Sequence, residues 1–209
     1  PTPPRPNVPR PSVKVIGIAA STGGPAALQR ILSDLPGNFP IPIFVVQHIA
    51  AGFVDGLAAW LSSTCPLRVR VAEAGEPVPA RTVLLAPEGR HIGANADGRI
   101  VVSDAQPING FRPSASYLFE SLARSYGAAA VGVILTGMGS DGVDGLRAVR
   151  AAGGFVLAQD ESTSVVYGMP REAVEAGVVD AVAPVEEVAA RLMHLVRAPS
   201  PFESKQGVP

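Results

Sequence analysis

Short apolar runs alternate with amphipathic segments along most of the chain. The run VKVIGIAA (13–20) predicts a buried strand. After a glycine-rich turn, apolar residues recur at the spacing of one helix face, at Leu28, Ile31, Leu32 and Leu35. A strand followed by a helix of this kind, repeated along the chain, is typical of βαβ units built around a parallel sheet.

The same alternation predicts the remaining elements. Further strands are expected at 41–48, 69–72, 128–135, 154–158 and 178–182, and further helices over 53–63, from Ala115, from Asp141 and from Val185. The rhythm changes between 81 and 104, where Asp97-Gly98 is a typical type I′ turn of a β-hairpin. The sequence therefore predicts an α/β fold: a single three-layer domain with a mainly parallel sheet flanked by helices on both faces, and an antiparallel hairpin excursion near 82–103.

Length and composition indicate a single packed domain and its boundaries in the chain. The 209 residues fit one domain, and 47% hydrophobic against 17% charged residues indicate that most of the length is packed. The first eleven residues contain six prolines, a composition that favours extended polyproline II over a core. We expect a proline-rich linker or tail over 1–12, the folded domain over 13–198 and a flexible C-terminal tail over 199–209.

Charge and cysteine content exclude several classes of protein. With 17 Lys and Arg against 18 Asp and Glu, the chain has no electrostatic basis for binding nucleic acid or an anionic membrane. The longest uncharged stretch, 35–54, contains prolines and polar residues that a bilayer core would not accept, and no signal peptide opens the chain. The single Cys65 cannot form an internal disulfide, and no pair of ligands has zinc spacing. We therefore expect a cytoplasmic protein without a metal.

Three polar residues follow strands of the predicted parallel sheet. Ser21 follows the first strand, His48 ends the second, and Asp141 follows the central strand in LTGMGSDG. In open parallel sheets the carboxyl ends of the strands meet at the edge where ligands bind. A serine, an imidazole and a carboxylate at one edge supply a nucleophile, its base and an orienting group. This combination predicts a Ser-His-Asp hydrolytic triad.

Taken singly, each of these residues also has a structural interpretation. Ser21 caps a helix, His48 is a half-buried histidine bonded to a carbonyl, and Asp141 is the N-cap of a helix beginning at Gly142. It is their combination that favours catalysis. The segment Ala19–Gly23 supports this interpretation, because its pattern of small residues around Ser21 resembles a nucleophile elbow between a strand and a helix.

Other features rank lower. STGG and TGMGSDG are rival candidates for phosphate cradles, but the chain has neither GxGxxG nor a P-loop sequence, so nucleotide binding ranks second. We expect His91, His194 and Cys65 to be structural, and Asp160 and Glu161 to cap a loop.

Six ordered segments between 13 and 197 closely resemble the chemotaxis protein-glutamate methylesterase family, the CheB-type catalytic domain. They are GIAASTGGPAAL, FVVQHIAAGF, LLAPEGRHI, FRPSASYLFESLA, VILTGMGSDGVDGL and AQDESTSVVYGMPREAVEAGVVD. The resemblance implies a carboxylic ester hydrolase that removes methyl esters from glutamates of methyl-accepting chemoreceptors and releases methanol. In many members of the family the enzyme also deamidates receptor glutamines.

The resemblance also implies the roles of individual residues. The family's catalytic serine, histidine and aspartate fall on Ser21, His48 and Asp141, and its proposed oxyanion contributors fall on Thr22 and Met138. No metal or other cofactor is implied. The methylesterase catalytic domain is then the segment 13–198.

The implied partners are the cytoplasmic helices of chemoreceptors and a phosphorylatable receiver domain upstream. No receiver is present in this sequence, so the chain is either a fragment of a receiver-linked protein or a stand-alone member. Because the substrate is a receptor helix, we expect a shallow cleft rimmed by Thr22, 50–53, 111–112 and Met169. The alternative to an enzyme is a non-catalytic ligand- or phosphate-binding module on the same parallel sheet.

Overall fold

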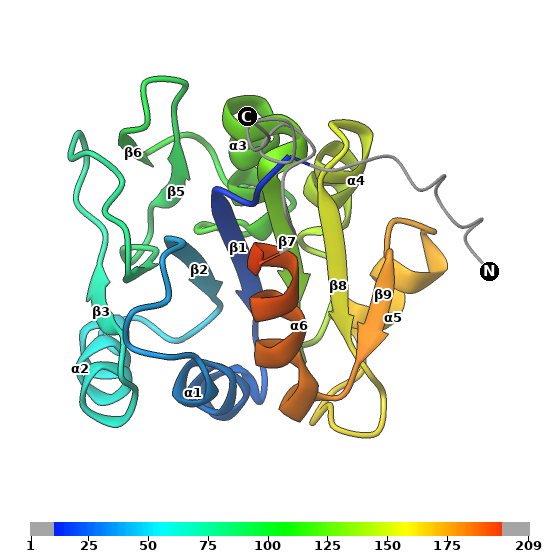
Figure 1. Ribbon diagram of the computed structural model, residues 1–209. Helices are drawn as coiled ribbons and strands as arrows, with labels where there is room; N and C mark the ends of the chain where they lie inside the picture. Colours follow the sequence, from blue (N-terminus) through cyan, green and yellow to red (C-terminus); the bar gives the residue numbers. More distant parts are fainter. Residues whose placement is uncertain (1–10, 198–209) are drawn as a thin grey trace, which may run out of the picture.

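Seven parallel strands form the centre of the protein, in the order β3-β4-β2-β1-β7-β8-β9 (Figure 1). The strands are β1 (Val15–Ala20), β2 (Ile43–Gln47), β3 (Arg68–Val71), β4 (Thr82–Leu85), β7 (Ala130–Ile134), β8 (Phe155–Gln159) and β9 (Ala181–Ala183). Every residue of β1, β2, β4 and β7 is buried. Both faces of the sheet are therefore covered, which explains why these strands are continuous apolar runs in the sequence.

The computed structural model describes residues 11–197. All but the last two residues of the linker expected over 1–12, and the whole tail expected over 199–209, lie outside the described residues. Within the described range, no helix combines the length and the apolar character that crossing a membrane requires.

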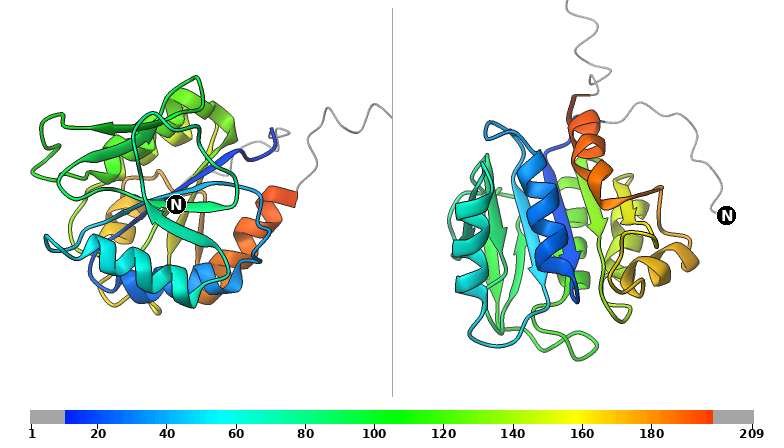
Figure 2. Two further views of the ribbon diagram at one scale, coloured as in Figure 1. Left: turned by 90° about the vertical axis from the view of Figure 1, so that its left-hand side faces the viewer. Right: turned by 90° about the horizontal axis from the view of Figure 1, so that it is seen from below.

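Helices cover both faces of the sheet, which confirms the three-layer arrangement (Figure 2). One face carries α1 (Gly24–Asp34), α2 (Val54–Thr64) and α6 (Val185–Arg197), and the other carries α3 (Ala115–Tyr126), α4 (Val143–Ala151) and α5 (Met169–Glu175). A short 3-10 turn, η1 (Gly127–Ala129), leads into β7. The sequence did not predict α5, because seven residues that include a proline are too few to show helical periodicity.

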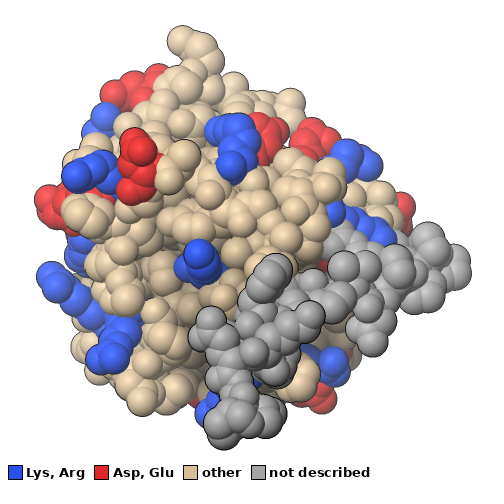
Figure 3. Space-filling view, turned by 45° about the horizontal axis from the view of Figure 1, so that its top comes forward, with Lys and Arg blue, Asp and Glu red and all other residues tan. Residues whose placement is uncertain are grey.

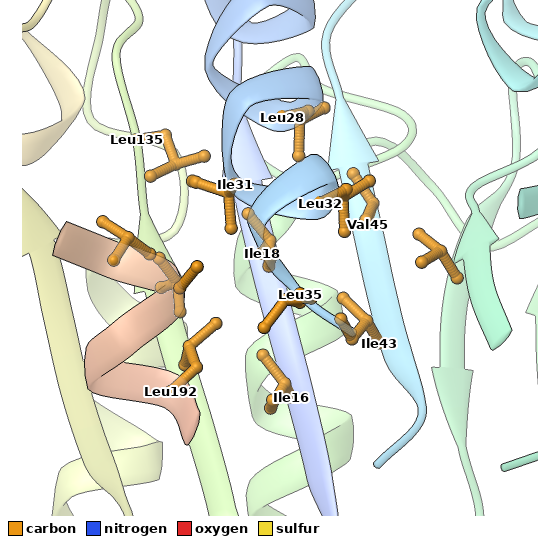
Figure 4. Packing of buried hydrophobic residues seen from close by; sticks show 14 of the residues in the cluster. Ile16, Ile18, Leu28, Ile31, Leu32, Leu35, Ile43, Val45, Leu135 and Leu192 are labelled. Atoms are coloured by element: carbon orange, nitrogen blue, oxygen red, sulfur yellow. The ribbon is translucent and has the colours of Figure 1, made fainter. Parts of the chain in front are cut away.

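The core consists of two clusters separated by the sheet. Successive side chains of a strand point to opposite faces, so Ile16 and Ile18 pack under α1 and α6 while Val15 and Ala19 face α3. Figure 4 shows the first cluster, in which the β1 side chains meet leucines of α1 and α6. Gly17 faces α3, where an added Cβ would lie 2.9 Å from a side-chain atom of the helix. Its lack of a side chain lets α3 approach the sheet closely.

The expected antiparallel hairpin is present, but it is shorter than predicted. It consists of β5 (His91–Ala94) and β6 (Ile100–Ser103), and its turn contains Gly98 with a φ of 71°. The first part of the predicted excursion, β4, instead pairs in parallel with β2 and β3 in the main sheet. Burial explains the difference, because all four residues of β4 need the cover that only the interior of the sheet provides.

Strand order and register determine where the candidate residues meet. β1 lies between β2 and β7, with Ala20 paired to Gln47 and Ala19 paired to Ile134. The three strands therefore end at nearly the same level. The chain leaves β1 toward β2 and leaves β7 toward β8, on opposite sides, so β1 and β7 flank the topological switch point where ligands of such sheets bind.

Candidate active site

Ser21 lies in a tight turn between β1 and α1. Its N–H donates to the carbonyl of Thr136 at 3.0 Å, and its own carbonyl accepts from Gly24 N at 2.8 Å. Gly23 adopts a left-handed φ of 81°, and a Cβ there would lie 2.6 Å from the Cβ of Val165. Only glycine fits this position, both in conformation and in space. The predicted turn between strand and helix is thus present.

His48 follows β2 and contacts the carboxylate of Asp141. Its Nε2 donates to Asp141 Oδ2 at 2.9 Å, and its ring stacks on Phe111 with the ring centroids 4.5 Å apart. The other ring nitrogen, Nδ1, is buried and has no hydrogen-bond partner among the described residues. A histidine that donates through Nε2 keeps a lone pair on Nδ1. His48 therefore has one nitrogen held by the carboxylate and one able to accept a proton.

The carboxylate of Asp141 lies at the N-terminus of α3. The structural interpretation of this residue, a cap of a helix that begins at Gly142, does not hold, because α4 begins at Val143 and Gly142, with a left-handed φ of 104°, is its N-cap. The carboxylate instead accepts from four donors outside its own helix: His48 Nε2, Ser114 Oγ, Ala115 N and Ser116 N. The tertiary fold supplies these donors, and they replace the local cap.

The hydrogen bonds keep Asp141 ionised despite its burial. The residue is only 3% exposed, and burial by itself would raise the pKa of the carboxyl group. The donors from His48, Ala115, Ser114 and Ser116 outweigh burial and hold the pKa below its usual range. The carboxylate is therefore charged at neutral pH and able to stabilise a protonated imidazole.

Gln47 links the turn of Ser21 to that of His48, and sequence reasoning missed it. Its amide nitrogen donates to the carbonyls of Ser21 and His48, both at 2.8 Å. The amide oxygen lies against α1, where a Cβ on Gly24 would be 2.0 Å away. The sequence could have singled out Gln47, because it is a polar residue at the end of the apolar strand IFVVQ.

Ser21 and His48 are neighbours, but no hydrogen bond joins their side chains in this structure. The backbone N–H of His48 donates to the carbonyl of Ala20 at 2.9 Å, which places the two turns next to each other. A triad requires His48 to contact both Ser21 and Asp141, and the structure shows only the hydrogen bond to Asp141. Catalytic hydrogen bonds are often loose in the absence of substrate.

The loop after β7 closes against Ser21. A Cβ on Gly137 would lie 2.7 Å from Ser21 Cβ and 2.4 Å from Met169 Sδ, so only glycine permits this contact. The next residue, Met138, is 71% exposed, and Thr22 is also exposed. Among the described residues, the backbone N–H groups of Thr22 and Met138 have no acceptor. Both predicted oxyanion contributors therefore have a free donor near the serine.

A second serine and histidine lie on the other side of Asp141. Ser114 and His91 are both fully buried. The bond between them runs from the backbone N–H of Ser114 to His91 Nδ1, at 3.1 Å, while the Ser114 hydroxyl donates to Asp141 Oδ1. The other nitrogen of His91 donates to the carbonyl of Gln106. Both ring nitrogens of His91 are therefore occupied by backbone groups, which is consistent with the structural role expected of it.

The remaining candidates lie in structural settings or away from this edge. Cys65 lies at the end of α2, with its Sγ 3.6 Å from Ser33 Oγ of α1, and His194 belongs to α6. Asp160 accepts from Ser162 and Thr163 and so caps its own loop. In the part of the chain that the structure describes, no three His, Cys, Asp or Glu side chains gather as metal ligands.

A cleft of about 300 Å³ opens beside His48, at the ends of β2 and β4. Its lining includes Gln47, Ile49, Ala50, Glu88, Arg112 and Pro113. Four exposed apolar side chains, Ile49, Phe53, Met138 and Val165, lie on the loops at this edge of the sheet, and we call them the apolar rim. Met169, which we expected on the rim, is fully buried under Gly137 and does not reach the surface.

The chain matches known proteins along nearly all of the described fold. The family model described as CheB methylesterase matches residues 16–192. The crystal structure of the Thermotoga maritima CheB methylesterase catalytic domain has a TM-score of 0.85 and 41% identity, and the match covers 88% of this chain and 100% of that one.

Relatives of known sequence are longer than this chain. The protein-glutamate methylesterase/protein-glutamine glutaminase 4 of Myxococcus xanthus is 55% identical over 183 residues, which are 88% of this chain and 52% of that protein. The protein-glutamate methylesterase/protein-glutamine glutaminase of group 3 operon of Rhizobium meliloti is 49% identical over 201 residues, 96% of this chain and 57% of that protein. The chain thus spans about half the length of the curated relatives it matches. On the family match and these identities together, the chain belongs to the CheB methylesterase family.

Proposed function

We propose that the protein is a serine hydrolase that removes methyl esters from glutamates of chemoreceptors and releases methanol. The observation that carries the proposal is the hydrogen bond of His48 to Asp141, which leaves Nδ1 of His48 without a partner among the described residues. The backbone of His48 bonds Ala20, so His48 follows β2 beside the turn of Ser21 at the switch point of the sheet. The printed names of the relatives supply the reaction class, protein-glutamate methylesterase and protein-glutamine glutaminase.

In the proposed mechanism Ser21 is the nucleophile and His48 the base. Nδ1 of His48 accepts the hydroxyl proton as Ser21 Oγ attacks the ester carbonyl, and Asp141 stabilises the imidazolium. The oxyanion accepts hydrogen bonds from the N–H groups of Thr22 and Met138, which have no other acceptor among the described residues. His48 then protonates methoxide, and methanol leaves. A water molecule, deprotonated by His48, releases the glutamate and restores Ser21.

Ser21 is favoured over Ser114 as the nucleophile for reasons of access and bonding. Ser114 is fully buried, and its only hydroxyl proton is directed at Asp141. Its contact with a histidine is made by the backbone N–H, which a base does not deprotonate in this chemistry. Ser21 is partly exposed, and its hydroxyl makes no hydrogen bond in the described structure.

We propose glutamine deamidation as a second reaction at the same site. An amide differs from a methyl ester only in its leaving group, so His48 would protonate the amide nitrogen, which departs as ammonia, where it otherwise protonates methoxide. The same acyl-enzyme follows, and water releases glutamate in both cases. The names of the relatives carry this activity beside the first.

The shape of the site supports a protein helix as substrate. A helix with its side chains is about 10 Å across and cannot enter a cleft of about 300 Å³, so the modified side chain has to reach Ser21 from outside. The apolar rim offers the contact surface for the rest of the helix.

Figure 3 shows the opposite edge of the sheet, where basic and acidic side chains are interspersed among the described residues without a continuous patch of one sign. We propose chemoreceptor helices in the cytoplasm as the partner, which places the enzyme in the cytoplasm.

Methanol release from a methylated receptor fragment tests the reaction and the substrate together. We expect methanol in proportion to enzyme, and an unchanged rate in EDTA, because Ser21 and His48 supply both the nucleophile and the acid-base group. Failure to release methanol, with the fragment still bound, would favour the non-catalytic binding module. A rate lost in EDTA and restored by a divalent ion would contradict the metal-free mechanism.

The greater length of the relatives supports a regulatory proposal. In a receiver-linked form of this enzyme, we propose that the receiver packs on the apolar rim and blocks helix access until phosphorylation shifts the interface. The expected result is a slower rate for the unphosphorylated linked protein than for the present chain, with equal rates after phosphorylation. Equal rates before phosphorylation would exclude occlusion, and the proposed triad would be unaffected.

A further inference from the structure

The carboxylate of Asp141 is held by helix α3 as well as by His48. We propose that Ser114 is a positioning residue of the active site: its hydroxyl, with the first amides of α3, fixes the carboxylate in the orientation in which it binds the catalytic histidine. The expected effect of Ser114 on the reaction rate rests on the proposed function. Its effect on the orientation of the carboxylate toward His48 does not.

Each oxygen of the carboxylate accepts two hydrogen bonds. Oδ2 accepts from His48 Nε2 at 2.9 Å and from Ala115 N at 2.7 Å. Oδ1 accepts from Ser114 Oγ at 2.7 Å and from Ser116 N at 3.2 Å. The shorter bond to Oδ1 comes from the serine hydroxyl. Without it, Oδ1 keeps only the longer bond from Ser116 N, and the carboxylate loses one of the restraints on its rotation about the Cβ–Cγ bond.

Ser114 is itself fixed from three sides. Its backbone N–H donates to His91 Nδ1 at 3.1 Å, and its hydroxyl oxygen accepts from Ser116 N at 3.1 Å and from Tyr117 N at 3.4 Å. The ring of His91 stacks on Tyr117. Because the acceptor side of the hydroxyl is occupied by these amides, its single proton is directed at Asp141. A chain of hydrogen bonds thus connects the carboxylate of Asp141, through Ser114, to His91 of β5 in the hairpin.

A purely structural role is the competing explanation, because Ser114 is also the N-cap of α3. Loss of a cap would lower stability but leave the bond between Asp141 and His48 intact. The two roles separate in Ser114→Gly, since glycine is nearly as good an N-cap as serine but has no hydroxyl. Ser114→Ala removes the hydroxyl and the cap together.

Ser121→Ala is the matched control. Ser121 is 3% exposed and lies on the same helix, but its hydroxyl bonds the backbone N–H and carbonyl of Ala94, away from Asp141. We expect kcat for methanol release to fall about ten- to a hundred-fold in both Ser114 variants, the loss typical of a hydrogen bond to a charged group, with KM within about twofold. Ser121→Ala should lose stability and keep its kcat.

A proton spectrum of His48 provides a readout that does not depend on activity. In the wild-type protein the Nε2 proton should give a slowly exchanging downfield signal, because it is bonded to a buried carboxylate. We expect this signal to exchange faster and move upfield in Ser114→Gly and Ser114→Ala, and to stay unchanged in Ser121→Ala.

Three results would overturn the inference. One is an unchanged His48 signal and kcat in both Ser114 variants, and another is an equal loss in Ser121→Ala. The third is labelling of Ser114 by a serine-reactive probe, which would make it a nucleophile. If the wild-type protein releases no methanol, the proposed function fails, and the His48 signal alone then decides whether Ser114 positions the carboxylate.

Discussion

Ser21→Ala should reduce kcat for methanol release by about 10⁴-fold or more, because no other group at the site forms the acyl-enzyme. The fold should not change, since the Ser21 hydroxyl makes no hydrogen bond in the described structure and the turn is held by backbone bonds to Thr136 and Gly24. Steady-state methanol release and a thermal melt measure the two effects separately. Loss of activity at an unchanged melting temperature is the expected combination.

Two comparisons sharpen this experiment. A serine-reactive fluorophosphonate should label the wild-type protein at Ser21 and leave Ser21→Ala unlabelled. Ser33→Ala is the control, because Ser33 lies on α1 and its hydroxyl donates to the carbonyl of Thr64, away from the site. Near-normal turnover in Ser21→Ala would end the proposed mechanism, and labelling at Ser114 would move the nucleophile to the buried serine.

Replacing Asp141 should damage both activity and stability. In Asp141→Ala, the donors on His48, Ser114 and Ala115 lose their acceptor in a buried place, whereas Ser116 N keeps its bond to Ser114 Oγ. We expect kcat to fall by about 10³- to 10⁴-fold and the free energy of unfolding to fall by about 3–5 kcal/mol, because each buried donor left without an acceptor costs about 1–3 kcal/mol. Methanol release and urea denaturation at neutral pH measure these losses.

Asparagine should not rescue this position. Each carboxylate oxygen faces a backbone N–H, Ser116 N at one and Ala115 N at the other, and a backbone amide cannot reverse its direction. The NH₂ group of an asparagine therefore meets a donor in either orientation. We expect Asp141→Asn to lose most of the stability that Asp141→Ala loses, and full stability in Asp141→Asn would contradict the four-donor arrangement.

The same carboxylate makes stability depend on pH. Its hydrogen bonds hold the folded-state pKa of Asp141 below the ordinary value, so its stabilising free energy is fully present above that ordinary value. The contribution is lost as the pH falls through the folded-state pKa. Urea denaturation between about pH 5 and pH 2 should show this loss in the wild-type protein and a smaller one in Asp141→Asn. Asp55→Asn, at an exposed position of α2, should behave as the wild type.

The sequence by itself determined the order of most strands and helices and singled out all three candidate positions, Ser21, His48 and Asp141. Buried parallel strands are continuous apolar runs, and helices show one apolar face, so local spacing was enough to predict β1, α1, β2 and β7. The turn at Ser21 was also predictable, because it depends on small neighbours that are adjacent in the chain. His48 followed from its place at the end of a strand in the same sheet.

The tertiary structure decided which groups those residues contact. Taken singly, Asp141 also had the interpretation of a cap for the helix that follows it, but its carboxylate caps α3, whose first residues are 25 or 26 positions away. Gln47 and Ser114 are ordinary residues in the sequence and become supports of the site only when β2, α3 and the loop after β7 pack together. The placement of β4 in the main sheet depended likewise on what covers its two faces. Local periodicity reports which face of an element is buried, whereas a hydrogen bond between distant segments depends on distances that only the packed chain defines.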